Sequence, residues 1–425
     1  MASEECDESA QDMADSNEHS WWSLLVMRAQ GARVRMTQSR VPWLLVAVFL
    51  VVVIGKILLL YSLEWMIEAG LIRDLRYNPY APGDLDATSD LILGLANQWD
   101  SQHFIEIARN GYPTGVLNHV LYAFAPVYPV MVASVNVMVG DLYLSGVIVS
   151  NVSHFIAMFA FYKVARLYVD YEKACLLTLV FALFPTLLVY CTVAYSEAPY
   201  LMFALWSWYY FKQERYFPCA LLTSLAILTR YIAGLLLVIY GVIELVKMID
   251  KYRTEHSFRR AFNSQLLWFV MPVVSVCALF AYFWSVTGNF MVTFDSHMFF
   301  GDKLSTPIDQ FRWFFEGFFT TVNPTVEPMS LVVEHYMFTI PFLVLTLSLL
   351  RDDEFLAIYG IFFMWVTLSM EGISGIAAPR IMLSAWVAFL ALRNRIDRTL
   401  ALVLASLFLV LSVWVLYQFE TRFFA

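Results

Sequence analysis

The sequence predicts an all-α integral membrane protein, a polytopic helical bundle with about 11–12 membrane segments and a large first external loop. Of its 425 residues, 60% are hydrophobic and 15% are charged, whereas soluble domains are about half apolar and a quarter charged. Several apolar runs reach the roughly 20 residues that a helix needs to cross a bilayer. Backbone groups in lipid must be hydrogen-bonded within the protein, and such continuous runs favour helices over a β-barrel.

The first 40 residues are expected to form a disordered cytoplasmic tail, acidic and then basic. The stretch from Glu4 to Glu18 is rich in acids and has no apolar periodicity, which is typical of disorder. Acids also precede the apolar part where a signal peptide would carry basic residues, so we expect no signal peptide. The five cysteines are scattered along the chain and predict neither a disulfide framework nor a metal motif.

Residues 41–425 are predicted to form one polytopic membrane domain, with span boundaries uncertain by about two to four residues. Two hydrophilic segments, 64–119 and 287–330, interrupt the apolar runs and are expected to be external loops, the first of them carrying the chemistry. The candidate spans lie at 41–63, 120–139, 142–168, 174–191, 197–211, 217–229, 231–248, 264–286, 331–350, 354–371, 380–392 and 399–417.

The basic residues predict the orientation, because short cytoplasmic loops carry an excess of lysine and arginine. Four arginines precede the first span, which places the N-terminus inside and segment 64–119 outside. That segment has eight acids and three arginines, a net charge of −5. Two full crossings between 120 and 168 would put Lys163 outside, so we expect a short or re-entrant segment around Phe124–Pro129.

Asp100 is the main candidate for chemistry in the first external segment. A helix beginning near Ser101 would place Phe104, Ile107 and Ala108 on one face, suited to lying on the membrane. Asp100 would then be at or near the helix N-cap, where a carboxylate stabilises the helix by about 1 kcal/mol. It is either this cap or a catalytic group, and His103, three residues on, could pair with it.

A second pair of acids, Asp84 and Asp86, precedes this helix. An Asp-x-Asp pair can hold a divalent metal on a sugar phosphate. Two acids in a Gly/Pro-rich loop are more often solvated turn residues, so the expected site contains no metal and this pair is the alternative.

Polar residues inside apolar runs are costly in lipid and are therefore functional candidates. Tyr195 and Glu197 open one run, where the helix dipole could satisfy the glutamate. Arg230 lies between two short runs and Arg380 begins another. Each arginine could extend its head to the membrane interface, or the two together could bind the phosphate of a lipid carrier.

Two further polar residues lie inside apolar runs and receive no role. Lys56 is in the middle of the first span, where Glu64 could act as its partner, and His154 is typical of a packed core histidine.

Four segments together resemble the GPI mannosyltransferase II (PIG-V type) family of GT-C glycosyltransferases, which includes prokaryotic relatives. The similarity covers about 45–235, and Ala378-Pro379-Arg380 is a plausible further element. The matching segments are Trp99-Asp100-x-x-His103-Phe104-x-x-Ile107-Ala108-x-x-Gly111-Tyr112, Phe124-Ala125-Pro126-x-Tyr128-Pro129, Ala194-Tyr195-Ser196-Glu197-Ala198 and Thr229-Arg230-x-x-x-Gly234.

This resemblance implies a mannosyltransferase that uses a polyprenyl (dolichyl) phosphate sugar donor and a glycolipid acceptor such as a GPI-anchor precursor, with inversion. Asp100 would be the base, with His103 beside it, and Trp99, Tyr195, Glu197, Arg230 and Arg380 would bind substrate. Arginines can stabilise a leaving lipid phosphate without a metal, and no cofactor is expected. Eukaryotic members tend to carry Arg-Ser-Asn-Gly where this chain has Arg230 to Gly234, so a prokaryotic glycan is an alternative acceptor.

The partners and compartment follow from the same resemblance. We expect the protein to contact membrane lipid and to bind no nucleic acid. A small membrane partner subunit is a further candidate partner. The compartment would be the endoplasmic reticulum membrane in a eukaryote and the cell membrane in a prokaryote. The rival interpretations are another polyprenyl-phosphate-sugar-dependent GT-C enzyme, a structural subunit, and a transporter or flippase. Transporters usually show repeated halves with ionisable residues at mid-membrane, and no repeat is evident here.

Overall fold

The computed structural model describes residues 43–72, 88–115, 119–300, 303–304, 306, 308–309, 312, 339–371, 380 and 386–421. The α-helices lie at α2 (Trp43–Glu68), α3 (Asp90–Ala96), α4 (Asp100–Asn110), α5 (Val127–Val139), α6 (Leu142–Ala165), α7 (Tyr171–Ala182), α8 (Pro185–Tyr190), α9 (Glu197–Lys212), α10 (Tyr216–Ile227), α11 (Gly234–Glu255), α12 (Phe258–Ala261), α13 (Val270–Thr287), α14 (Val292–Ser296), α17 (Glu354–Leu368), α20 (Val387–Leu390) and α21 (Arg398–Thr421). The 3-10 helices are η2 (Val120–Ala123), η3 (Tyr231–Ala233), η4 (Ser264–Phe269), η5 (His297–Phe300), η6 (Leu349–Arg351) and η8 (Ala391–Asn394), and the antiparallel strands are β1 (Lys303–Leu304) and β2 (Met370–Glu371).

Membrane-length helices dominate the fold, which confirms the predicted all-α membrane architecture. Within the described residues, five helices are long and apolar enough to cross a bilayer: Trp43–Glu68, Leu142–Ala165, Tyr231–Glu255, Ser264–Thr287 and Arg398–Glu420. Shorter apolar helices lie at Val127–Val139, Tyr216–Ile227, Thr339–Arg351 and Glu354–Leu368. On α2, large apolar side chains such as Leu50 and Ile54 are more than half exposed, as expected for a face that lipid covers.

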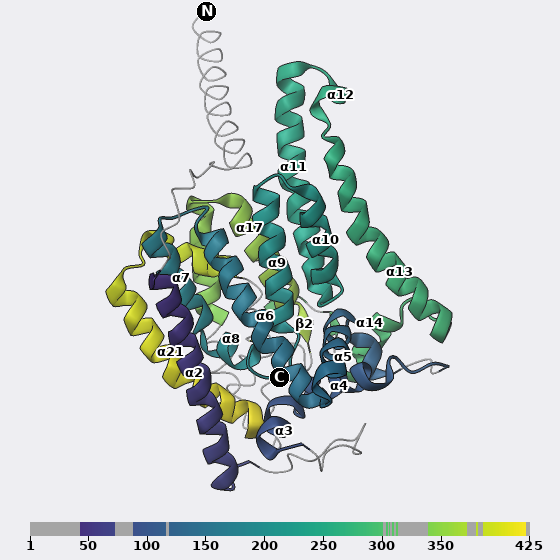
Figure 1. Ribbon diagram of the computed structural model, residues 1–425. Coiled ribbons are helices and arrows are strands. Elements are labelled where there is room, and N and C mark those ends of the chain that lie inside the picture. Colours follow the sequence, from purple (N-terminus) through teal and green to yellow (C-terminus); the bar gives the residue numbers. More distant parts are fainter. Residues whose placement is uncertain are drawn as a thin grey trace, which may run out of the picture.

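One continuous segment contributes a large part of the core of the bundle, because every residue from Ala174 to Met202 is buried. This segment contains most of α7, all of α8 and the beginning of α9. The predicted span 174–191 is therefore two short helices, since Pro185 begins a new helix at α8. Helix α6 packs along α9, and α2 and α21 lie side by side against α7 and α8 (Figure 1).

The expected short segment around Phe124–Pro129 is present as η2 followed by α5. Helix α5 has 13 residues, a rise of about 20 Å, whereas the hydrocarbon core is about 30 Å thick. Helix α6 has 24 residues and is long enough to cross alone. By length, therefore, only α6 of this pair reaches across a bilayer alone, and the single crossing inferred from Lys163 stays a prediction.

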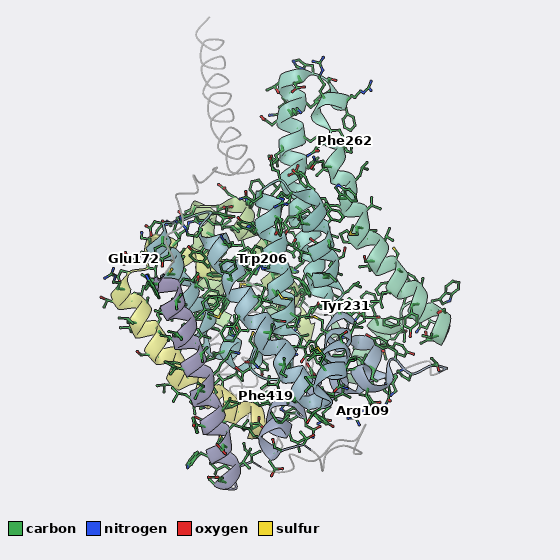
Figure 2. All side chains as sticks on the ribbon, in the orientation of Figure 1. Arg109, Glu172, Trp206, Tyr231, Phe262 and Phe419 are labelled. Carbon is green, nitrogen blue, oxygen red and sulfur yellow. The ribbon has the colours of Figure 1, made fainter. Side chains whose placement is uncertain are left out.

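Acidic and basic parts of the chain lie at opposite ends of the bundle. Helices α3, α4 and α5 lie at one end and α12 lies at the other (Figure 1). Side chains at the two ends, such as Arg109 and Phe419 below and Phe262 above, are well separated in Figure 2. The α12 end carries Arg259 and Arg260, so the charge rule predicts that the α4 end is the external one.

Candidate active site

The site is built on the junction between α8 and α9, at the end of the bundle that carries α4. Glu197 is the first residue of α9, as the sequence predicts, so its carboxylate lies at the positive end of the helix dipole. Its side chain is only 1% exposed. A buried carboxylate is costly unless charged groups pair with it, and two arginines do so here.

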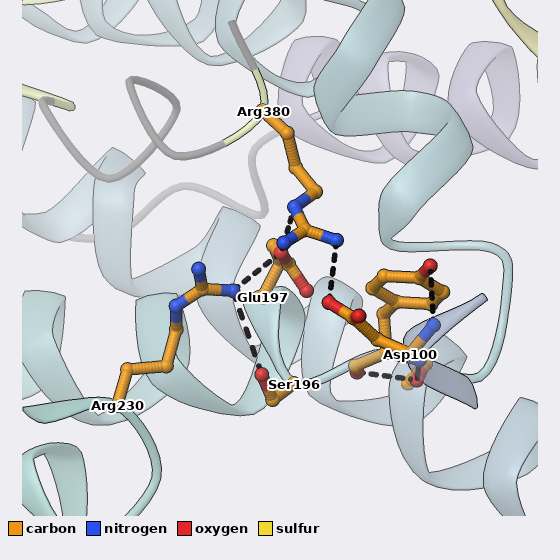
Figure 3. A network of polar contacts seen from close by, with 7 residues as sticks. Asp100, Ser196, Glu197, Arg230 and Arg380 are labelled. Carbon is orange, nitrogen blue, oxygen red and sulfur yellow. Dashed lines mark hydrogen bonds and ion pairs between the residues drawn. The ribbon is translucent and has the colours of Figure 1, made fainter. Parts of the chain in front are cut away.

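Arg230 and Arg380 contact the same oxygen of Glu197. Arg230 Nη1 donates to Glu197 Oε1, and Arg380 Nε lies 3.4 Å from that atom. Arg380 Nη1 in turn donates to Asp100 Oδ2 over 2.7 Å, although the two residues are 280 positions apart in the chain. Figure 3 shows the resulting network of two acids and two arginines, whose formal charges cancel.

Aromatic side chains form one wall of the network. The Arg380 guanidinium lies 5.3 Å from the centre of the Tyr195 ring and 5.7 Å from that of Tyr190, which is the distance of a cation–π contact. The Tyr195 hydroxyl also accepts a hydrogen bond from the Asp100 amide over 3.2 Å. Arg380 is therefore buried between rings and acids and does not extend to the membrane interface.

The turn before Asp100 has an unusual backbone. Trp99, the N-cap residue of α4, has φ 49° and ψ −124° and makes no side-chain cap. A positive φ in a bulky residue costs about 1–3 kcal/mol and is often found at functional sites. The Trp99 indole is fixed by a 2.7 Å hydrogen bond from Nε1 to the Phe419 carbonyl, so the end of α21 holds this turn in place.

Asp100 is the first residue of α4 and its side chain is paired with Arg380, which favours an ionic role over helix capping. The apolar face of α4 does not lie on a membrane, and that expectation was wrong. Phe104 and Ile107 are buried in the protein, because α5 covers them. The Phe104 ring contacts that of Tyr128 edge-on, with 5.0 Å between ring centres.

His103 lies one turn along α4 from Asp100, with its ring centre 4.9 Å from that of Phe124. Burial lowers the pKa of His103 below its ordinary value of 6.5, and the nearby Asp100 partly offsets this. The imidazole is therefore neutral at pH 7, and the Asp100 charge acts on its pKa without reversing the direction of the shift.

Several polar atoms of the network remain available to a ligand. Asp100 is 19% exposed and Arg230 is 15% exposed. Asp100 Oδ1 and the Nε and Nη2 atoms of Arg230 have no hydrogen-bond partner among the residues that the structure describes. Glu197 Oε2 is buried and also unpartnered. The site thus offers carboxylate oxygens to hydroxyl groups and guanidinium nitrogens to an anion.

Within the described part of the chain, no group of three or more histidine, cysteine or acidic side chains could hold a metal ion. Asp84 and Asp86, the alternative metal pair, lie outside the described residues. Tyr190 and the Phe419 carbonyl are site components that sequence reasoning missed. Tyr190 was one aromatic among many in an apolar run, and a backbone carbonyl has no sequence signature.

Comparison with known proteins gives a family match. The model of the family described as mannosyltransferase (PIG-V) matches residues 44–288, which is more than half of the chain. GPI mannosyltransferase 2 of Schizosaccharomyces pombe is 27% identical over 136 residues, covering 31% of this chain and 28% of that protein. The chain thus aligns with less than a third of that relative.

A solved structure also resembles the chain at low similarity. It is ArnT from Cupriavidus metallidurans bound to undecaprenyl phosphate, with a TM-score of 0.48 and 14% identity. The match covers 82% of this chain and 60% of that one.

Proposed function

Because the chain belongs to the mannosyltransferase (PIG-V) family, we propose that it is a membrane mannosyltransferase. Its donor is a polyprenyl (dolichyl) phosphate mannose and its acceptor is a hydroxyl group of a glycolipid such as a GPI-anchor precursor. The observation that carries the proposal is the network that joins Asp100, Glu197, Arg230 and Arg380 at the external end of the bundle. It combines a partly exposed carboxylate with two cations, as transfer from a lipid phosphate requires.

Asp100 is the base of the proposed reaction. The acceptor oxygen attacks the anomeric carbon of mannose, and the bond from that carbon to the phosphate oxygen breaks, with inversion. Asp100 takes the proton from the acceptor hydroxyl, and the lipid phosphate leaves with the electron pair. Neutral His103 lines the same turn of α4, where it adds no positive charge that would compete for the base.

Arg230 and Arg380 stabilise the negative charge that develops on the leaving phosphate. Arg380 connects the two functions, because one guanidinium contacts Asp100 and Glu197 together. Glu197 holds both arginines in place and offers its unpartnered Oε2 to a sugar hydroxyl. Tyr195 and Trp99 orient the first residue of α4.

The membrane and the partners belong to the same proposal. A GPI-anchor precursor as acceptor implies the endoplasmic reticulum membrane of a eukaryote, and a prokaryotic glycan implies the cell membrane. A small membrane partner subunit would fit the exposed apolar faces of the bundle, as would lipid. The second candidate function is transfer of another sugar from a polyprenyl phosphate, since the network contacts the phosphate and the hydroxyl and does not itself define the sugar.

The test is transfer of labelled mannose from dolichyl-phosphate mannose to membrane glycolipids, with Asp100→Asn compared with the wild type at equal expression. Loss of a general base costs about 10²- to 10⁴-fold in rate. The control is Asp90→Asn, which removes an exposed acid from the same part of the chain. Full activity of Asp100→Asn would overturn the role of Asp100, and no transfer by the wild type would overturn the choice of donor.

A further inference from the structure

Lys56 is a buried cation that the proposed chemistry does not use. It lies in the middle of α2 and is 6% exposed. Glu64, the partner that the sequence suggested, is not paired with it. The ammonium group instead donates to Asn151 Oδ1 at 2.7 Å, to the Cys191 carbonyl at 2.8 Å and to Thr192 Oγ1 at 3.2 Å. Its three donors thus meet three acceptors.

Two of these three acceptors belong to the loop that joins α8 to α9, residues 191–196. Cys191 is the C-cap residue of α8, and a carbonyl at a helix end lacks a partner within the helix. Lys56 satisfies this carbonyl and also fixes the side chain of the next residue, Thr192. The cation therefore binds the point at which the chain leaves α8 and turns toward α9.

Helix α6 holds the same loop from another side. Asn151 Nδ2 donates to the Thr192 carbonyl over 2.9 Å. Ser150 Oγ donates to the Tyr195 carbonyl over 2.9 Å and lies 3.2 Å from the Tyr195 amide. We call Lys56, Ser150 and Asn151 the loop clamp. Because Asn151 contacts both Lys56 and Thr192, the clamp is a connected network in which loss of the cation loosens Asn151 too.

The loop ends in the site. Tyr195 contacts Asp100 through its hydroxyl and Arg380 through its ring, and Glu197 follows two residues later. The loop is short, so displacement at Cys191 and Thr192 moves Tyr195 and Glu197 with it. An error of about 1 Å in the position of a catalytic group can lower the rate about 100-fold.

We propose that Lys56 is a positioning residue for the site, acting through the loop at residues 191–196. This inference rests on the proposed function for its kinetic consequence but not for its structural one. A lysine in the middle of a lipid-facing helix is costly, and a methionine of similar length would fill the same space without a charge. The geometry assigns a role to the charge, because the ammonium group binds the Cys191 carbonyl and the Thr192 side chain at the start of the loop. That loop contains Tyr195 and leads directly to Glu197.

The experiment compares Lys56→Met with the wild-type full-length chain in detergent or nanodiscs. Hydrogen exchange is measured at the amides of 192–196, and kcat is measured per folded molecule. We expect exchange in the loop to be at least tenfold faster, and kcat to fall about 10- to 100-fold. The control is Lys163→Met, which removes a lysine over the Phe159 ring at the other end of α6 and should leave both quantities within twofold.

A milder variant keeps the test decisive if Lys56→Met does not fold. Asn151→Ala removes the Asn151 contacts with Lys56 and the Thr192 carbonyl but leaves Lys56 bound to the Cys191 carbonyl and the Thr192 side chain. It should speed loop exchange and lower kcat in the same direction by a smaller factor. A merely structural lysine would lower Tm while kcat per folded molecule and relative loop exchange stayed within twofold of wild type, and that result would overturn the inference. If the wild type transfers no mannose, the proposed function fails. The positioning role is judged separately, and it is rejected if loop exchange in Lys56→Met stays within twofold of wild type.

Discussion

Removal of the Arg230 guanidinium tests how the site holds its anionic substrate. Arg380 is buried and engaged with Asp100 and Glu197. Arg230 is more exposed and, among the residues that the structure describes, donates only through Nη1, to Glu197 and Ser196. Its Nε and Nη2 atoms are therefore the donors best placed to receive a phosphate. We expect Arg230→Gln to weaken donor binding while keeping a polar side chain at this position.

The expected size follows from the contacts that are lost. A hydrogen bond to a charged group contributes about 1.5–3 kcal/mol, and each 1.4 kcal/mol is about a factor of ten. The KM for the polyprenyl-phosphate donor should therefore rise about 10- to 150-fold. The arginine contacts phosphate both before and during transfer, so most of the loss should be in KM and less in kcat.

The assay is initial-rate transfer over a range of donor concentrations, with dolichyl phosphate as a competing product. The inhibition constant of that product should rise in parallel with the donor KM. The control is Arg398→Gln, because Arg398 is 76% exposed and pairs with Glu172 at the start of α7. A donor KM within twofold of wild type in Arg230→Gln, with transfer retained, would refute the assignment of Arg230 to the phosphate.

Three other predictions concern stability and pH. Glu197→Gln should destabilise the protein by about 3 kcal/mol or more, because it leaves buried arginine charge without its carboxylate, and a Tm equal to wild type would contradict this. Gly360→Ala should lower Tm, since its Cβ would lie 2.6 Å from Thr346 Cγ2, whereas Gly241→Ala has open space and should leave Tm equal or higher. Burial lowers the pKa of His103, so as pH falls through 6.5 the unfolded chain takes up this proton first and stability declines. The loss of Tm between pH 7.5 and 5.5 should therefore be smaller in His103→Gln, and an identical loss would argue against the buried neutral form.

The sequence was most informative where a polar residue interrupts an apolar run. Glu197, Arg230 and Arg380 were selected for that reason, since lipid penalises unpaired polar groups. The structure brings all three into one network with Asp100. Their catalytic and binding roles stay predictions, whereas their proximity is a finding.

The pairing between these residues could not be derived from the sequence. Arg380 meets Asp100 only once the chain has folded, and no local pattern encodes a contact across 280 residues. Lys56 was matched with an acid eight residues away, but its acceptors are an amide, a hydroxyl and a backbone carbonyl. The apolar face of α4 was assigned to lipid because amphipathicity does not distinguish a membrane surface from a neighbouring helix.

The order in which the ribosome delivers the chain has a consequence for its biosynthesis. At about 5–20 residues per second, roughly 15–60 s separate the synthesis of Asp100 from that of Arg380, 280 residues later. Once Arg230 has been made, it can pair with Glu197, whereas Asp100 contacts Arg380 and has to wait for that residue, which leaves one uncompensated negative charge. Helix α21, which lies beside α2 (Figure 1), arrives later still. A nascent chain that stops before Arg380 would therefore leave Asp100 without its arginine and would lack α21, which covers one face of α2. Both features would be open to recognition by membrane quality control.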